Sequence, residues 1–215
     1  MSEGSTPAGD REGETAPQPR WFAERTPDER AGYAQYFRGL EARGDDVDGE
    51  ARFVHAMLPR GATVLDAGCG VGRVAAALAR WGHRAAGVDA DPVLVEAGRG
   101  FYPDLPLATV DLCGLSPARL ESVGLPADYD VVVAAGNVML FVAEGTECRV
   151  LDAVARVLRP GGRAVFGFRT GAAYTHDDLD RDAASVGWTR EHRFATWQLD
   201  AWHDGADWAV SVYRG

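Results

Sequence analysis

Three glycines alternate with other residues directly after a short apolar run, in the segment Asp66-Ala-Gly-Cys-Gly-Val-Gly72. The run itself, 62–66, has the length and composition of a buried strand, and 71–81 carries apolar side chains at helical spacing. A strand, a glycine-rich turn and a helix in this order let a ligand approach backbone N–H groups at a helix N-terminus. The segment therefore predicts an α/β sheet with a ligand site at its first turn.

The alternation of strand and helix continues along the chain. Further strands are expected at 83–89, 106–112, 129–135, 163–168, 189–199 and 207–213, and further helices at 92–99, 146–158 and 175–186. Alternating elements indicate parallel crossovers and a sheet covered by helices on both faces. The last two strands have no helix between them, which favours an antiparallel hairpin. The predicted fold class is α/β, a doubly wound sheet of seven mostly parallel strands with an antiparallel C-terminal strand.

Three regions are expected. Residues 1–20 are rich in Gly, Pro, Ser, Thr and charged side chains, which predicts a disordered tail. Residues 21–58 hold two helices, the first opening at Thr26-Pro27 with a capping box to Glu29, and are expected to cap the ligand site. Residues 59–215 form the ligand-binding domain.

Charge and cysteine content exclude several classes of partner. The formal net charge of −10 disfavours nucleic acid and anionic membranes, which both require a basic surface. The three cysteines, Cys69, Cys113 and Cys148, show no zinc-ligand spacing, so no metal site is expected. Neither an apolar leader nor a membrane-spanning stretch is visible, and a reduced cytoplasmic location is the simplest interpretation. The sequence does not define an oligomeric state.

Acidic residues follow the first three expected strands. Asp66 precedes the first glycine by two residues, Asp89 ends the second strand 21 residues after Gly68, and Asp111 lies near the end of the third. An acid at the position of Asp89 accepts hydrogen bonds from ribose hydroxyls. The dinucleotide fingerprint GxGxxG lacks an acid at the position of Asp66. A carboxylate there would repel a pyrophosphate, but it suits a ligand with an ammonium and a sulfonium group. For Asp111, a turn aspartate is an equally good interpretation.

Together these motifs resemble the class I S-adenosylmethionine-dependent methyltransferases, and in particular small actinobacterial-type members with a Gly-Glu-Ala-Arg-Phe segment, here 49–53. The resemblance covers about 50–213 and includes the Arg-Pro-Gly-Gly turn at 159–162. It implies a Rossmann-like sheet of order 3-2-1-4-5-7-6 and S-adenosylmethionine as cofactor. Asp66 and the Gly68 backbone would then lie near the methionine portion, Asp89 at the ribose and Asp111 at the adenine. The expected cofactor-binding residues are Asp66, Gly68, Cys69, Gly70, Asp89, Ala90, Asp111, Leu112 and Asn137.

The predicted function is methyl transfer from S-adenosylmethionine to a small-molecule acceptor by in-line attack. After the fourth strand the chain has Gly136-Asn137-Val138-Met139 and not an Asn-Pro-Pro-Tyr motif, which argues against adenine or glutamine as the acceptor. Two alternatives stay open at this point. One is an NAD(P)-dependent oxidoreductase on a similar sheet, and the other is a catalytically inactive S-adenosylmethionine-binding interaction protein.

The catalytic residues are not identifiable from the sequence. His176 is a candidate general base because it follows the fifth strand on the ligand side, but it also suits the start of an acidic helix. Tyr33 and Tyr36 are candidates to reach over the cofactor, and Arg52 is a candidate partner for the methionine carboxylate. Core packing for the tyrosines and a solvated helix face for Arg52 are the alternatives.

Overall fold

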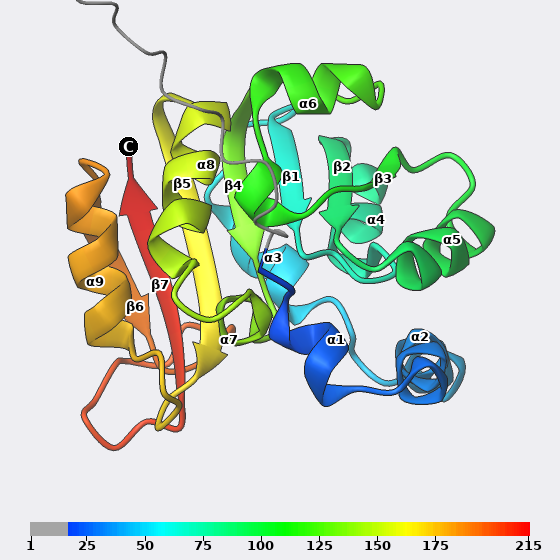
Figure 1. The fold of residues 1–215 in the computed structure, drawn as a ribbon, viewed down its shortest axis with the longest axis horizontal. Coiled ribbons are helices and arrows are strands. Elements are labelled where there is room, and N and C mark those ends of the chain that lie inside the picture. The colour runs from blue at the N-terminus through cyan, green and yellow to red at the C-terminus, as the bar shows by residue number, and fades with distance from the viewer. Residues whose placement is uncertain (1–16) are drawn as a thin grey trace, which may run out of the picture.

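The computed structural model describes residues 17–215. Seven strands form one sheet in the order β3-β2-β1-β4-β5-β7-β6 (Figure 1). β7 is antiparallel to both of its neighbours, and the pairs from β3 to β5 are parallel. The strands are β1 Thr63–Ala67, β2 Arg84–Asp89, β3 Leu107–Thr109, β4 Tyr129–Ala134, β5 Leu158–Arg169, β6 Thr189–Phe194 and β7 Trp208–Arg214. The predicted fold class and strand order are confirmed.

Helices cover both faces of the sheet, so both faces of the central strands are buried. Leu65 and Val132 join one core with α8 and α9, whereas their neighbours Val64 and Val131 join the opposite core with α3 and α4. This explains why the central strands are continuously apolar. The helices are α1 Arg20–Glu24, α2 Pro27–Ala42, α3 Gly49–Ala56, α4 Arg73–Arg80, α5 Pro92–Phe101, α6 Pro117–Ser122, α7 Val138–Phe141, α8 Glu147–Val157 and α9 His176–Ser185, with a 3₁₀ turn η1 Leu112–Gly114.

The third strand is shorter than the predicted 106–112. β3 ends at Thr109, and the Asp111 carboxylate then accepts a hydrogen bond from the Cys113 N–H at 2.8 Å, which starts η1. A side-chain cap of this kind competes with strand pairing. The sixth strand likewise ends at Phe194 and not at 199, and a long loop connects it to β7.

The fifth strand begins earlier than the predicted 163. Leu158 already pairs with Tyr129, and pairing resumes at Arg163 with Val131 after a bulge. Gly161 takes a positive φ of 74° within this bulge. The Arg-Pro-Gly-Gly segment therefore bends the strand locally instead of separating it from α8.

The N-terminal helices lie beside the end of the sheet at which the parallel strands finish (Figure 1). α2 begins as predicted, with the Thr26–Glu29 capping box formed. α1 precedes it and includes Arg20, which donates to Glu147 at 2.6 Å. Of the predicted tail, 1–20, the first 16 residues lie outside the described residues. Its last residue, Arg20, is the first residue of α1. Between 17 and 215, no helix is both long and apolar enough to cross a membrane.

Candidate functional site

The turn after β1 brings backbone close to α7. The N–H groups of Gly68 and Cys69 both donate to the Val88 carbonyl of β2, at 2.8 and 3.0 Å. Gly68 has a φ of 75°, and a Cβ built there would lie 2.6 Å from the Val138 side chain. Only glycine fits this position without displacing α7, and α4 begins directly after Gly72.

Asp66 is a buried carboxylate behind this turn. It lies near the end of β1, is 2% exposed, and accepts a hydrogen bond from the Ala75 N–H of α4 at 3.2 Å. Burial raises the pKa of Asp66 to about 7. A cationic ligand group placed beside it would favour the ionised form and lower this pKa.

Asp89 ends β2 and faces the same turn. One carboxylate oxygen accepts from the Gly70 N–H and the other from the Asp91 N–H, both at 2.8 Å. Burial raises the pKa of Asp89 to about 6, against these two hydrogen bonds. Each oxygen keeps a second lone pair, so the fixed carboxylate can still accept hydrogen bonds from two neighbouring hydroxyls.

Asn137 holds the turn after β4. Its backbone takes the left-handed conformation with a φ of 69°, and its N–H donates to the Gly167 carbonyl of β5 at 3.1 Å. The Asn137 side-chain oxygen accepts from the Arg169 N–H at 2.9 Å. These contacts fix the start of α7 against the end of β5, and they commit the side-chain oxygen to the backbone.

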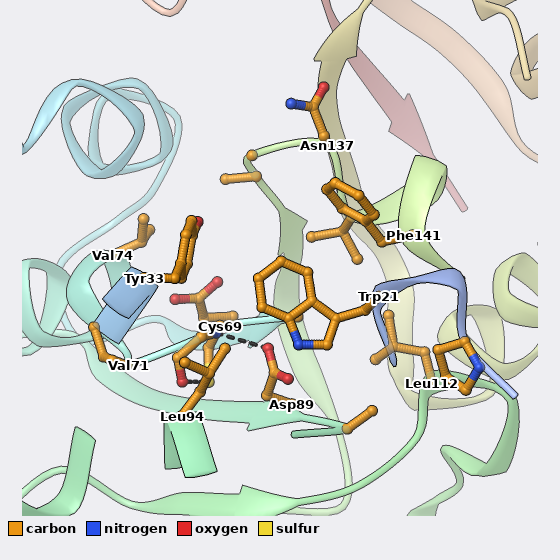
Figure 2. Close-up of a pocket in the computed structure, with 18 of the residues that line it drawn as sticks. Trp21, Tyr33, Cys69, Val71, Val74, Asp89, Leu94, Leu112, Asn137 and Phe141 are labelled. Carbon is orange, nitrogen blue, oxygen red and sulfur yellow. Dashed lines mark hydrogen bonds between the residues drawn. The ribbon is translucent and has the colours of Figure 1, made fainter. Parts of the chain in front are cut away.

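All nine residues predicted to bind the cofactor line one pocket at the C-terminal ends of β1 to β4. They are Asp66, Gly68, Cys69, Gly70, Asp89, Ala90, Asp111, Leu112 and Asn137. Figure 2 shows Cys69, Asp89, Leu112 and Asn137 arranged around this space. Ligands of open α/β sheets bind at this end of the strands.

An aromatic side chain from α1 closes one side of the pocket. The Trp21 indole lies edge-on to Tyr33 and Phe141, with ring centroids 5.3 and 5.5 Å apart (Figure 2). Its N–H donates to Asp91 at 2.8 Å, and Asp91 also accepts from Arg30 at 2.8 Å. Of the helices α1 and α2, Trp21, Tyr33 and Phe37 line the pocket.

Comparison with known proteins identifies the family. Residues 64–162 match the model of a methyltransferase domain. The solved structure of a TehB-like SAM-dependent methyltransferase from Corynebacterium glutamicum is 36% identical, with a TM-score of 0.78, and the match covers 87% of this chain and 98% of that one. The chain belongs to the class I S-adenosylmethionine-dependent methyltransferases.

Curated relatives share the domain but differ in what their names describe. An S-adenosyl-L-methionine-dependent Diels-Alderase from Neonectria sp. is 31% identical over 134 residues, which is 61% of this chain and 48% of the relative. A ribosomal protein L11 methyltransferase from Dechloromonas aromatica is 39% identical over 104 residues, 47% of this chain and 30% of the relative. The chain thus spans less than half the length of these relatives. Membership of the family identifies S-adenosylmethionine as the cofactor.

Two charged residues of the methyltransferase pocket are absent from the sequence-based expectations. Glu50 of α3 and Arg73 of α4 both line it and form a two-pronged ion pair at 2.7 and 2.9 Å. Arg73 also donates to the Val47 carbonyl. Arg73 directly follows Gly72, and Glu50 lies in the Gly-Glu-Ala-Arg-Phe segment, so both motifs contained the signal.

Of the remaining candidate residues, one lines the pocket and three do not. Tyr33 lines the pocket, whereas Tyr36 is 57% exposed on α2 and Arg52 forms an exposed ion pair with Asp46. His176 is not among the lining residues, and its ring packs on Trp202 with centroids 4.9 Å apart. The structure therefore does not bring His176 or Arg52 to the nine pocket residues.

Proposed function

We propose that this protein transfers a methyl group from S-adenosylmethionine to a small-molecule acceptor in the pocket at the ends of β1 to β4. The observation that carries the proposal is the meeting of Asp66, Gly68, Asp89 and Asp111 in one pocket, at the ends of the three strands β1, β2 and β3 or in the turns that follow them. The cofactor requires acceptors for its ribose hydroxyls and its ammonium group, with a glycine turn between them, and these carboxylates are placed to serve as those acceptors.

The residues fit the cofactor group by group. Because Gly68 has no side chain, its turn packs directly against Val138, and the turn backbone forms part of the pocket wall that the methionine portion would approach. Asp66 would lie near its ammonium group, Asp89 would accept from the ribose hydroxyls, and Asp111 and Leu112 would border the adenine. The cofactor, when bound, supplies a methyl group made electrophilic by the attached sulfonium.

The chain itself contributes alignment and exclusion of water. Trp21, Tyr33 and Phe141 wall the pocket with apolar surface, and Asn137 fixes α7 so that Phe141 keeps its position. Holding an acceptor lone pair in line with the methyl carbon in such a site accounts for much of the rate of a reaction of this kind. No histidine among residues 17–215 lines the pocket, so we assign no general base.

A small molecule is the acceptor class that the surface favours. The net charge of −10 opposes nucleic acid, and the α1 and α2 side chains over the pocket oppose a bulky macromolecular segment. One relative is named a Diels-Alderase, so cofactor binding by itself does not establish transfer.

The test is a screen of metabolites with S-adenosylmethionine labelled on its methyl carbon. We expect label on at least one small molecule, and its transfer at subsaturating cofactor should fall in Asp89→Ala, because this variant binds the cofactor more weakly. Cofactor binding with no transfer to any class of metabolite would favour the inactive binding protein. Protein and RNA fractions are incubated in parallel, and transfer of the label only to these would overturn the small-molecule assignment.

A further inference from the structure

Among the described residues 17–215, one cation in the pocket wall has no anionic partner. Arg25, at the C-terminal end of α1, lines the pocket, and within 17–215 no carboxylate lies within ion-pair distance of it. Its Nε is buried without a hydrogen-bond partner in the same range. Burying a guanidinium donor unpaired is costly, so the position calls for an explanation.

The neighbouring arginines show what is usual in this wall. Arg20 pairs with Glu147 at 2.6 Å, Arg30 with Asp91 at 2.8 Å, and Arg73 with Glu50 at 2.7 Å. The carboxylate of Glu29 is near enough for the Arg25 charge to lower its pKa, but its hydrogen bonds with Thr26 lower it more. The Glu29 carboxylate is thus already used in the α2 cap.

Aromatic rings hold Arg25 in place. Its guanidinium carbon lies 4.6 Å from the centroid of the Trp21 ring and 5.2 Å from that of Phe141. Rings of this kind attract the cation but take up none of its in-plane N–H groups as a carboxylate would. The guanidinium is therefore positioned with donors still available for a two-pronged contact with an anion.

Arg25 lies on the side of the pocket formed by α1 and α7, where it contacts Trp21 and Phe141. The charges that act most strongly on Asp66 are Arg73, Asp89 and Glu50. The arginine among these charges, Arg73, is paired with Glu50. Phe141, which Arg25 contacts, belongs to the helix after β4.

We infer that Arg25 binds an anionic group of the acceptor, so that the acceptor is a carboxylate- or phosphate-bearing molecule with an apolar part against Trp21 and Phe141. This inference rests on the proposed function. An anion in this pocket has two possible sources, the acceptor and the methionine carboxylate, and the experiment must separate them.

Isothermal titration on the full chain, saturated with S-adenosylhomocysteine, supplies the test. The probes are benzoate and phenyl phosphate, with benzamide as the neutral analogue of benzoate. We expect both anions to bind about tenfold or more tighter than benzamide. Arg25→Gln should remove this preference, Arg25→Lys should restore part of it, and Arg60→Gln, an equal charge change in the exposed turn before β1, should leave it intact.

The cofactor arm uses S-adenosylhomocysteine and 5′-methylthioadenosine, which lacks the amino-acid portion. We expect Arg25→Gln to leave the affinity for both within about threefold. A selective loss of S-adenosylhomocysteine would assign Arg25 to the methionine carboxylate and overturn the inference. Equal binding of benzoate and benzamide by the wild-type complex, or binding of neither, would overturn it as well. Failure of the wild-type chain to bind S-adenosylhomocysteine would instead contradict the proposed function.

Discussion

Two acids at the end of β2, two residues apart, have different tasks. Asp89 faces the pocket and orders the glycine turn, whereas Asp91 is fully buried and joins α5 to the N-terminal helices. Their spacing places one at the ligand and the other at the helix cap. Substitutions at the two positions should therefore have opposite consequences.

Asp89→Ala should weaken cofactor binding and leave the fold intact. Hydrogen bonds to a charged acceptor contribute about 1.5–3 kcal/mol each, so losing one or two ribose contacts corresponds to roughly tenfold to several hundredfold in affinity. Titration with S-adenosylhomocysteine measures the loss, and thermal unfolding provides the control. Unchanged affinity in Asp89→Ala would remove this residue from the site.

Asp66 makes binding depend on pH. Because burial raises its pKa to about 7, the ionised form that an ammonium group requires is lost as the pH falls through 7. One coupled proton weakens affinity about tenfold for each pH unit below that pKa. We expect S-adenosylhomocysteine to bind more weakly at pH 6 than at pH 8, with a smaller dependence in Asp66→Asn. A flat profile for the wild-type chain would contradict the role of Asp66.

The same burial has a cost in the ligand-free protein. A carboxyl whose pKa is higher folded than unfolded contributes stability that is lost as the pH rises from about 4 to about 7. Asp66→Asn should therefore stabilise the free protein at pH 8, by about 2 kcal/mol. Chemical denaturation at pH 8 and pH 5 checks this, since the gain should shrink at the lower pH. Destabilisation at both pH values would show that the Ala75 contact outweighs the burial of charge.

At the level of elements, α1, α2 and α5 depend on one carboxylate. Asp91→Ala removes the α5 cap and leaves Trp21 without its acceptor and Arg30 without its counter-ion. Removing one partner of a buried ion pair costs about 3–5 kcal/mol, to which the lost cap adds about 1 kcal/mol. We expect a drop of at least about 3 kcal/mol in the free energy of unfolding, with Asp89→Ala as the matched control. Equal stability of the two variants would contradict the separation of roles.

Short elements are also where the sequence was least informative. The strands and helices around the glycine turn could be predicted because apolar periodicity persists over several residues. α1, α6 and α7 have 5, 6 and 4 residues, too few for a periodic pattern. The predicted third strand, 106–112, is too long because the apolar residues around Asp111 do not reveal that its carboxylate caps η1.

The pocket residues, too, divide into those that a local sequence pattern predicts and those that it does not. The nine expected residues could be located because they follow strands whose C-terminal ends must meet at one edge. Trp21, Arg25 and Phe141 come from short helices that reach the pocket only through tertiary packing, so no local spacing marks them. The sequence predicts Arg52 as a candidate partner of the methionine carboxylate and does not single out Arg73, because two helix arginines look alike until their partners Asp46 and Glu50 are known.

For the whole molecule, the central claim is that this end of the sheet binds the methyl donor. The most direct test is titration of the full chain with S-adenosylmethionine, S-adenosylhomocysteine and NAD in parallel. The account predicts saturable binding of the first two, one per chain, displaced competitively by each other, and none of NAD, because Asp66 opposes a pyrophosphate beside the glycine turn. Binding of NAD, or no binding of either methionine-derived ligand by the folded protein, would contradict it.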